Sequence, residues 1–149
     1  DKSALILGPG ISREPEVGLM TEDLLGRLKK PLLLDADALW HLTEFKEKMK
    51  SLKYPLILTP HPGEMGRLLG ISAGQVQEDR LFAAKRFAEE YGCFLVLKGA
   101  RSLVATPGGE VFINTTGNPG LASAGTGDVL SGMIGAFICQ GHPPLDSCL

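Results

Sequence analysis

The sequence predicts an α/β fold in which a mainly parallel sheet is covered by helices. Short apolar runs alternate along the chain with longer stretches whose apolar residues have helical spacing. This alternation is typical of parallel strands joined by helices. In addition, a polar or glycine-rich segment follows most of the apolar runs. Since ligands bind at the carboxyl ends of the strands in open parallel sheets, these segments are expected to converge on one cleft.

The first half of the chain predicts three strands and three helices. The strands are expected at residues 4–7, 32–34 and 56–58, each of which is short and apolar. Helices are expected at residues 19–30, 38–50 and 64–69, where leucines recur at helical spacing or a proline and a glycine stand near the start.

The second half predicts a long helix over residues 72–91, ended by Gly92, and a fourth strand over residues 93–97. Residues 102–114 form two alternating runs around a Thr-Pro-Gly-Gly turn, which predicts a hairpin. A last helix is expected from about Asp128 to Gln140, with Gly141 at its end. Because the sequence has no internal repeat or linker, one domain, or part of one, is expected over residues 1–149.

Composition excludes several classes of protein. The 149 residues are 44% hydrophobic and carry a net charge of −2 without a basic run, which argues against a nucleic-acid partner. No apolar stretch is long enough to span a membrane, and no signal peptide opens the chain, so a cytoplasmic protein is expected. The three cysteines share no metal-like spacing with histidines, which favours reduced, structural thiols and no structural metal.

Residues 117–128 are the most informative segment. They contain four glycines and run directly into the last predicted helix. Backbone N–H groups near Gly125, Thr126 and Gly127 can form an anion hole, and Asp128 beside them can act as a base. This pairing suits phosphoryl transfer to a hydroxyl group. The alternative is a flexible surface loop in which Asp128 is the N-cap of the helix. The segment matches neither a P-loop nor a dinucleotide fingerprint.

Three other polar segments allow both functional and structural interpretations. His61, held between two prolines, can bind a substrate or, with Glu64, can cap the following helix. Asp35 and Asp37 can bind a cation or a substrate, but helix capping is favoured for them. Lys98 follows a predicted strand and can place an ammonium near a nucleotide, or it can be a solvated lysine.

Taken together, the motifs resemble the ribokinase-like fold, a three-layer α/β/α architecture, and within it the ADP- or ATP-dependent NAD(P)H-hydrate dehydratases. Four segments carry the resemblance in the order of that family: GPG at residues 8–10, PLLLDADAL at 31–39, TPHPGEMGRL at 59–68 and GNPGLASAGTGDVLSG at 117–132. Related sugar and hydroxymethylpyrimidine kinases share the last loop but generally lack TPHPGE.

The resemblance implies a repair reaction. Hydrated NADH or NADPH is restored when a nucleotide phosphorylates its hydroxyl group and phosphate is then eliminated. ADP or ATP with Mg²⁺ is implied, and a homo-oligomer is expected. Asp128 is the implied base and also contacts the substrate. The other implied substrate contacts are Gly10, His61, Pro62, Gly63, Glu64 and Arg67. The implied nucleotide contacts are Lys98, Gly99, Ala100, Arg101, Ser102, Asn118, Gly120, Ala124, Gly125, Thr126 and Gly127.

The chain departs from the family in two ways. The first loop continues as Gly10-Ile11-Ser12 where the family has GPGLG. Family domains are also longer, so we expect a fragment that lacks N- and C-terminal parts, exposes apolar faces and is weakly active or inactive alone. Two alternatives to the dehydratase stay open. One is a vitamin or sugar kinase of the same fold, and the other is a non-catalytic nucleotide-binding fragment.

Overall fold

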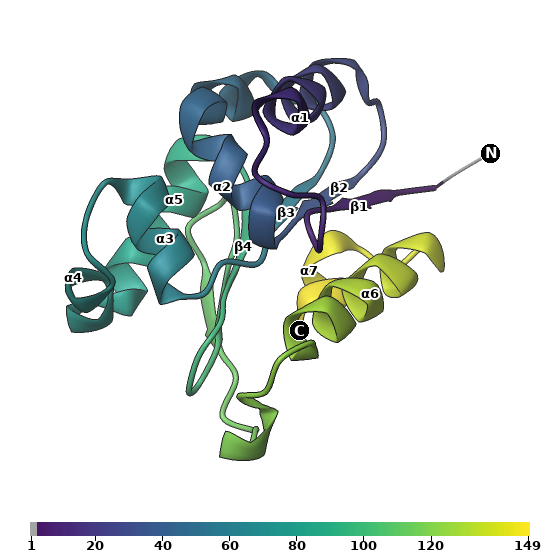
Figure 1. Cartoon of the computed structure of the whole chain (residues 1–149). Helices are drawn as coiled ribbons and strands as arrows, with labels where there is room; N and C mark the ends of the chain where they lie inside the picture. Colours follow the sequence, from purple (N-terminus) through teal and green to yellow (C-terminus); the bar gives the residue numbers. More distant parts are fainter. Residues whose placement is uncertain (1–2) are drawn as a thin grey trace.

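Short runs of branched apolar residues form a six-stranded sheet in the computed structural model, which describes residues 3–149 (Figure 1). The strands are adjacent in sequence order. Strands β1 to β4 run parallel, whereas β5 and β6 form an antiparallel hairpin on β4. The α/β class and the hairpin are therefore confirmed. The strand bounds are β1 Leu5–Leu7, β2 Leu32–Leu34, β3 Leu56–Leu58, β4 Phe94–Leu97, β5 Leu103–Ala105 and β6 Val111–Ile113.

Helices cover both faces of the sheet and complete three layers (Figure 1). One face carries α1 Pro15–Arg27, α2 Ala36–Phe45, α3 Pro62–Leu69, α4 Ala73–Glu78 and α5 Arg80–Tyr91, with a 3₁₀ turn, η1, at Lys46–Ser51. The other face carries α6 Thr126–Cys139 and α7 Pro144–Cys148. A second 3₁₀ turn, η2 Pro119–Leu121, lies in the loop before α6. No helix among residues 3–149 has both the length and the apolar character needed to cross a bilayer.

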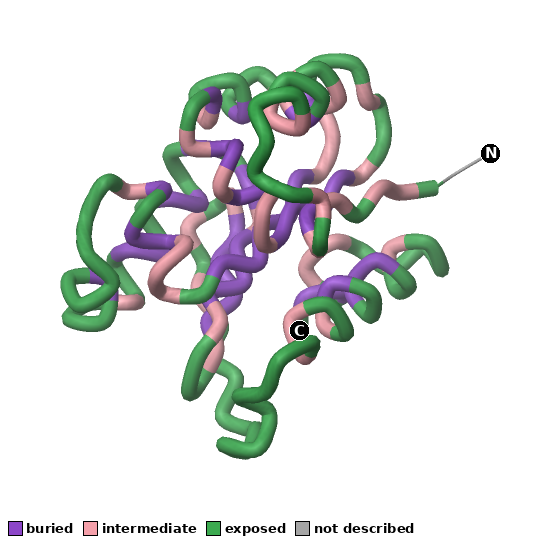
Figure 2. Tube along the Cα trace, in the orientation of Figure 1, coloured by how far each residue is buried: buried purple, intermediate pink, exposed green. Residues whose placement is uncertain are grey.

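The two faces of the sheet bury different side chains because successive residues of a strand point to opposite sides. Leu32 and Leu34 of β2 pack with α1 to α5, whereas Leu33 packs with Ile134 of α6. Burial is therefore concentrated in the strands and in the helix faces that meet them (Figure 2). Burial also raises the pKa of Cys93 and of Cys148 to about 12, which keeps both as inert thiols.

Some large apolar side chains remain exposed, as expected from the sequence. Val129, Met133 and Phe137 follow one another at helical spacing on α6 and are 62%, 53% and 40% exposed. Ile113 on the last strand is 49% exposed. The helical face opposite the sheet on α6 is therefore apolar and open to solvent.

Helix boundaries differ from the predicted ones at several points. The helix α1 begins at Pro15 because proline suits the first helical turn, and it ends before the two lysines that were assigned to it. The predicted helix over residues 72–91 is two helices. Asp79 leaves the helical conformation and accepts the backbone N–H of Phe82, so that it caps α5. Both α2 and α6 start two residues earlier than predicted, α2 gives way to η1 after Phe45, and α7 was not predicted.

One glycine allows the loop after β1 to touch the end of β2. Gly8 has φ of +140°, and a methyl group on its Cα would lie 1.7 Å from the backbone oxygen of Asp35. Any side chain at this position would push the two loops apart.

We therefore expect Gly8→Ala to lower the free energy of unfolding by more than about 3 kcal/mol, through overlap and backbone strain. The matched control is Gly132→Ala in α6, where a methyl group meets no atom within 4 Å. This control is expected to stabilise the chain by roughly 0.5–1 kcal/mol, because it removes a glycine from a helix. Urea unfolding of both variants measures the difference. A Gly8→Ala variant as stable as the parent chain would contradict this packing.

Candidate active site

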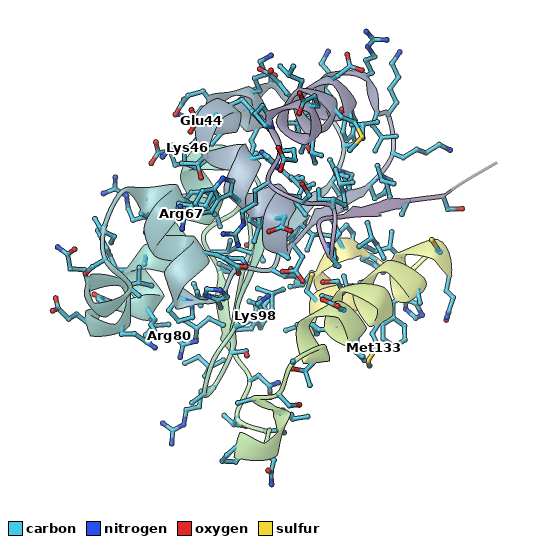
Figure 3. All side chains as sticks on the ribbon, viewed as in Figure 1. Glu44, Lys46, Arg67, Arg80, Lys98 and Met133 are labelled. Carbon is cyan, nitrogen blue, oxygen red and sulfur yellow. The ribbon has the colours of Figure 1, made fainter. Side chains whose placement is uncertain are left out.

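The carboxylate of Asp35 lies at the carboxyl end of β2 and is 1% exposed. Its Oδ1 accepts hydrogen bonds from the Lys98 ammonium at 2.8 Å and from the backbone N–H of Ala36 at 2.9 Å. Its Oδ2 accepts a hydrogen bond from the Ser131 hydroxyl at 2.7 Å. A buried carboxylate is tolerated only with such partners. The contacts tie the ends of β2 and β4 to α6, with Lys98 between them (Figure 3).

Helix capping explains only part of the aspartate pair. Asp35 occupies the N-cap position of α2, as the favoured interpretation predicts, but its carboxylate also binds two distant residues. Asp37 lies in the first turn of α2 and accepts a hydrogen bond from Arg13 Nε at 2.8 Å. The two aspartates therefore face different neighbours.

Glu64 brings the start of α3 to the same place. Its Oε2 lies 3.8 Å from Lys98 Nζ and accepts the backbone N–H of His61 at 2.7 Å. In return, His61 Nδ1 accepts the backbone N–H groups of Gly63 and Glu64 at 3.0 and 3.2 Å. This is a capping box, so the helix-capping role that the sequence left open for His61 and Glu64 is present. A substrate contact of His61 remains a prediction.

The start of α6 is open where the start of α3 is closed. No side chain caps α6, and its N-cap residue is Gly125, with φ of +87°. The N–H of Thr126 donates to the backbone oxygen of Ser123 at 3.4 Å, which leaves the N–H groups of Gly127 and Asp128 without an acceptor within residues 3–149. Asp128 is the third residue of α6, so the interpretation of Asp128 as the N-cap is wrong. Its side chain is exposed and has no hydrogen bond or ion pair within residues 3–149.

The open start of α6 lies beside the lysine. A methyl group on Gly127 would lie 3.5 Å from Lys98 Nζ and 3.7 Å from Asp35 Oδ2. An ammonium group and unpaired N–H donors at a positive helix end therefore point to the same region, which favours an anion. The carboxylate of Asp128 is the next side chain along the helix.

A half-buried arginine that the sequence did not single out holds the loop after β4. Arg80, the first residue of α5, donates hydrogen bonds to the backbone oxygens of Ala100 at 2.6 Å and Leu97 at 3.1 Å. Burial lowers the pKa of its guanidinium. Among the other predicted nucleotide contacts, the Ser102 hydroxyl donates to the backbone oxygen of Gly99 in the same loop, and Arg101 is exposed. Of the predicted contacts in residues 98–102, Lys98 is thus the one whose side chain lies beside Asp35 and Glu64.

Residues 117–125, the glycine-rich loop before α6, make no hydrogen bond with Asp35, Lys98 or Glu64. The loop extends away from the sheet and is exposed along its length (Figure 2). Asn118 accepts the N–H of Gly120 at 2.8 Å, and Thr126 Oγ1 donates to two carbonyl oxygens of the same loop. Ala124 is exposed. Gly10 is exposed as well, in the loop after β1.

A pocket of about 190 Å³ opens beside Glu64. Four of the predicted substrate contacts line it, and Pro62, the first residue of α3, lies between His61 and Gly63 in the sequence. The remaining lining residues were not predicted as substrate contacts. One of them, Trp40, is the single tryptophan of the sequence. Ala36 and Leu39 lie in the PLLLDADAL segment, whereas no motif marks Arg13 or Trp40, which meet the pocket only in the folded chain. The lining residues are Arg13, Ala36, Leu39, Trp40, His61, Gly63, Glu64 and Arg67.

Comparisons with known sequences extend over the whole chain. The family model described as Carb_kinase, NAD(P)H-hydrate dehydratase, matches residues 1–149. The chain is 49% identical over 140 residues to the bifunctional NAD(P)H-hydrate repair enzyme Nnr of Moorella thermoacetica. It is 42% identical over 151 residues to the ADP-dependent (S)-NAD(P)H-hydrate dehydratase of Neisseria meningitidis serogroup B. These alignments cover 94% and 99% of this chain, but 26% and 51% of the two relatives.

Solved structures have the same fold. An ADP/ATP-dependent NAD(P)H-hydrate dehydratase from Bacillus subtilis, co-crystallised with ATP/Mg²⁺, superposes with a TM-score of 0.86 at 34% identity. A ribokinase-like superfamily protein from Enterococcus faecalis V583 superposes with a TM-score of 0.83 at 30% identity. The matches cover 99% and 98% of this chain, and 52% and 50% of the two structures. The fold is therefore ribokinase-like, and the chain spans about half of these structures.

The Asp35 contacts predict a large difference between two lysine variants. Lys98→Met removes the cation from a buried carboxylate, and we expect it to lower the free energy of unfolding by about 3 kcal/mol. Lys48→Met breaks only an exposed ion pair with Glu22 and is expected to cost less than about 1 kcal/mol. Ser131→Ala is expected to cost about 1–3 kcal/mol, since it removes one donor from Asp35. Urea unfolding measures all three, and equal losses for Lys98→Met and Lys48→Met would refute the assignment.

Proposed function

We propose a function from one premise: this chain belongs to the NAD(P)H-hydrate dehydratase family. The protein that carries this sequence uses ADP or ATP to dehydrate hydrated NADH or NADPH. One observation supports the proposal above the others. The Lys98 ammonium lies beside the uncapped start of α6 at the carboxyl edge of the sheet, and the exposed carboxylate of Asp128 belongs to the first turn of that helix.

The nucleotide phosphates would occupy the region between Lys98 and the start of α6. Unpaired N–H groups in the first turn of α6 would stabilise the negative charge that develops on the transferred phosphoryl group. Lys98 would add a positive charge at a fixed position, because Asp35 holds its ammonium at 2.8 Å. The loop that Arg80 holds and the glycine-rich residues 118–127 would complete the nucleotide site.

The reaction would proceed in two steps. In the first, Asp128 accepts the proton of the substrate hydroxyl as the hydroxyl oxygen attacks the terminal phosphorus of the nucleotide. A new O–P bond forms while the P–O bond to the rest of the nucleotide breaks, so that ADP leaves when ATP is the donor and AMP leaves when ADP is the donor. In the second, the C–O bond of the ring breaks and its electron pair leaves with the phosphate. A proton then departs from the neighbouring ring carbon, which restores the double bond. The sum is hydrated NADH plus ATP giving NADH, ADP and phosphate.

Mg²⁺ fits this arrangement as a companion of the nucleotide. Within residues 3–149 no three His, Cys, Asp or Glu side chains converge to hold a metal ion. Nucleotide-dependent enzymes commonly bind Mg²⁺ through phosphates, waters and one or two carboxylates. When bound, the ion would neutralise phosphate charge and would be held by the nucleotide phosphates and by waters, which leaves Asp128 free to act as the base.

We expect Asp128→Asn in the protein that carries this sequence to lower turnover of hydrated NADH by roughly 10²- to 10⁴-fold, which is the usual contribution of a general base. The affinity for ADP or ATP should change little, since the N–H groups and Lys98 remain. Recovery of NADH absorbance measures turnover, and equilibrium titration measures nucleotide binding. Asp146→Asn, an exposed aspartate on α7, is the control and should be fully active. Full activity of Asp128→Asn would refute the assignment of the base.

A further inference from the structure

Two arginines from different elements stack on the ring of Trp40. The guanidinium carbon of Arg67, on α3, lies 3.5 Å from the ring centroid, and that of Arg13, in the loop after β1, lies 4.3 Å from it. Trp40 is on α2 and half-buried. All three residues line the 190 Å³ pocket. We call Arg13, Trp40 and Arg67 the arginine–tryptophan cluster.

The stacked guanidiniums have hydrogen-bond donors to spare. Stacking uses the flat face of a guanidinium, while its five N–H donors lie in the plane and point outward. Arg13 donates from Nε to Asp37 at 2.8 Å, which leaves its two terminal nitrogens. The guanidinium of Arg67 has no hydrogen bond or ion pair within residues 3–149. The ring therefore fixes the orientation of both groups, and their donors remain open to a ligand.

The positive charges of Arg13 and Arg67 favour an anion at their end of the pocket. Glu64, the acid that lines the pocket, is already engaged by the backbone of His61 and lies close to Lys98. The backbone donors at the start of α3 are occupied by the His61 ring. An anion that enters the pocket would therefore be bound by guanidinium forks, and these match phosphate oxygens better than a point charge does.

We propose that the arginine–tryptophan cluster binds the pyrophosphate of the hydrated dinucleotide. This inference rests on the proposed function, because that function requires the nicotinamide hydroxyl to lie beside Asp128 and Lys98. Glu64 lies 3.8 Å from Lys98, and Arg67 follows Glu64 at i+3, about 5–6 Å further along the same face of α3. The phosphates are the first anionic groups beyond the nicotinamide ribose, and the cluster lies about one helical turn beyond the reacting end.

Binding is tested without catalysis by titrating the 149-residue chain with inorganic pyrophosphate. Trp40 is the single tryptophan, so its emission reports on this pocket. We expect a saturable change in emission, and a dissociation constant that rises about 10- to 100-fold in Arg67→Gln, as for the loss of a charge-assisted hydrogen bond. The dissociation constant of Arg67→Lys should lie between those of the parent chain and Arg67→Gln. Arg86→Gln is the matched control, because this exposed arginine also stacks on an aromatic ring, Phe82.

Turnover of the protein that carries the sequence provides the second readout. Arg67→Gln should raise the KM of hydrated NADH and of hydrated NADPH by similar factors, with kcat and the KM of the nucleotide unchanged. A rise confined to hydrated NADPH would overturn the pyrophosphate assignment in favour of the 2′-phosphate. An unchanged pyrophosphate affinity in Arg67→Gln would overturn the phosphate site itself. If the unmutated protein does not turn over hydrated NADH but its Trp40 emission still responds to pyrophosphate, the proposed function is refuted and the phosphate site stands.

Discussion

The buried carboxylate of Asp35 is the contact on which the arrangement of the site depends. It receives hydrogen bonds from Lys98, which is 63 residues away in sequence, and from Ser131, which is 96 residues away. Because an unpartnered carboxylate in this position would be very costly, β2, β4 and α6 are held in one relative placement. The same bond aims the Lys98 ammonium at the start of α6. A structural requirement of the core thereby positions a charge at the ligand-binding edge.

The two helices that start near Lys98 have opposite designs. The first turn of α3 is closed by the His61 and Glu64 capping box, so its backbone donors are used internally. The first turn of α6 has no cap, starts from a glycine and carries the unpaired Asp128. In the proposed mechanism, backbone groups at α6 would serve phosphoryl transfer, whereas side chains on α3 would recognise the substrate. This division separates the reacting end of the substrate from the end that the arginine–tryptophan cluster would bind.

Local patterns predicted the strands well because short apolar runs between turn residues have few other solutions. Helix starts were less predictable. Because prolines occupy the first helical turn, α1 and α3 begin earlier in the sequence than predicted. Asp79 caps α5 and thereby divides the single helix predicted over residues 72–91 into two. The motif residues Asp35, Glu64 and Lys98 were found from the sequence, but their contacts were not. Ser131 and Arg67 lie within two of the motifs, but nothing in those motifs pairs them with Asp35 or Trp40. Arg80, Arg13 and Trp40 lie outside any motif, and only tertiary packing brings them to the site.

The central claim is that a phosphoryl group is transferred to the substrate hydroxyl before the C–O bond breaks. The most direct test is to prepare hydrated NADH in ¹⁸O-labelled water, so that the hydroxyl oxygen carries the label. The protein that carries this sequence is then supplied with unlabelled ATP, and the inorganic phosphate is analysed by mass spectrometry. This account predicts one ¹⁸O atom in each phosphate released. Unlabelled phosphate, with the label recovered in water, would contradict it.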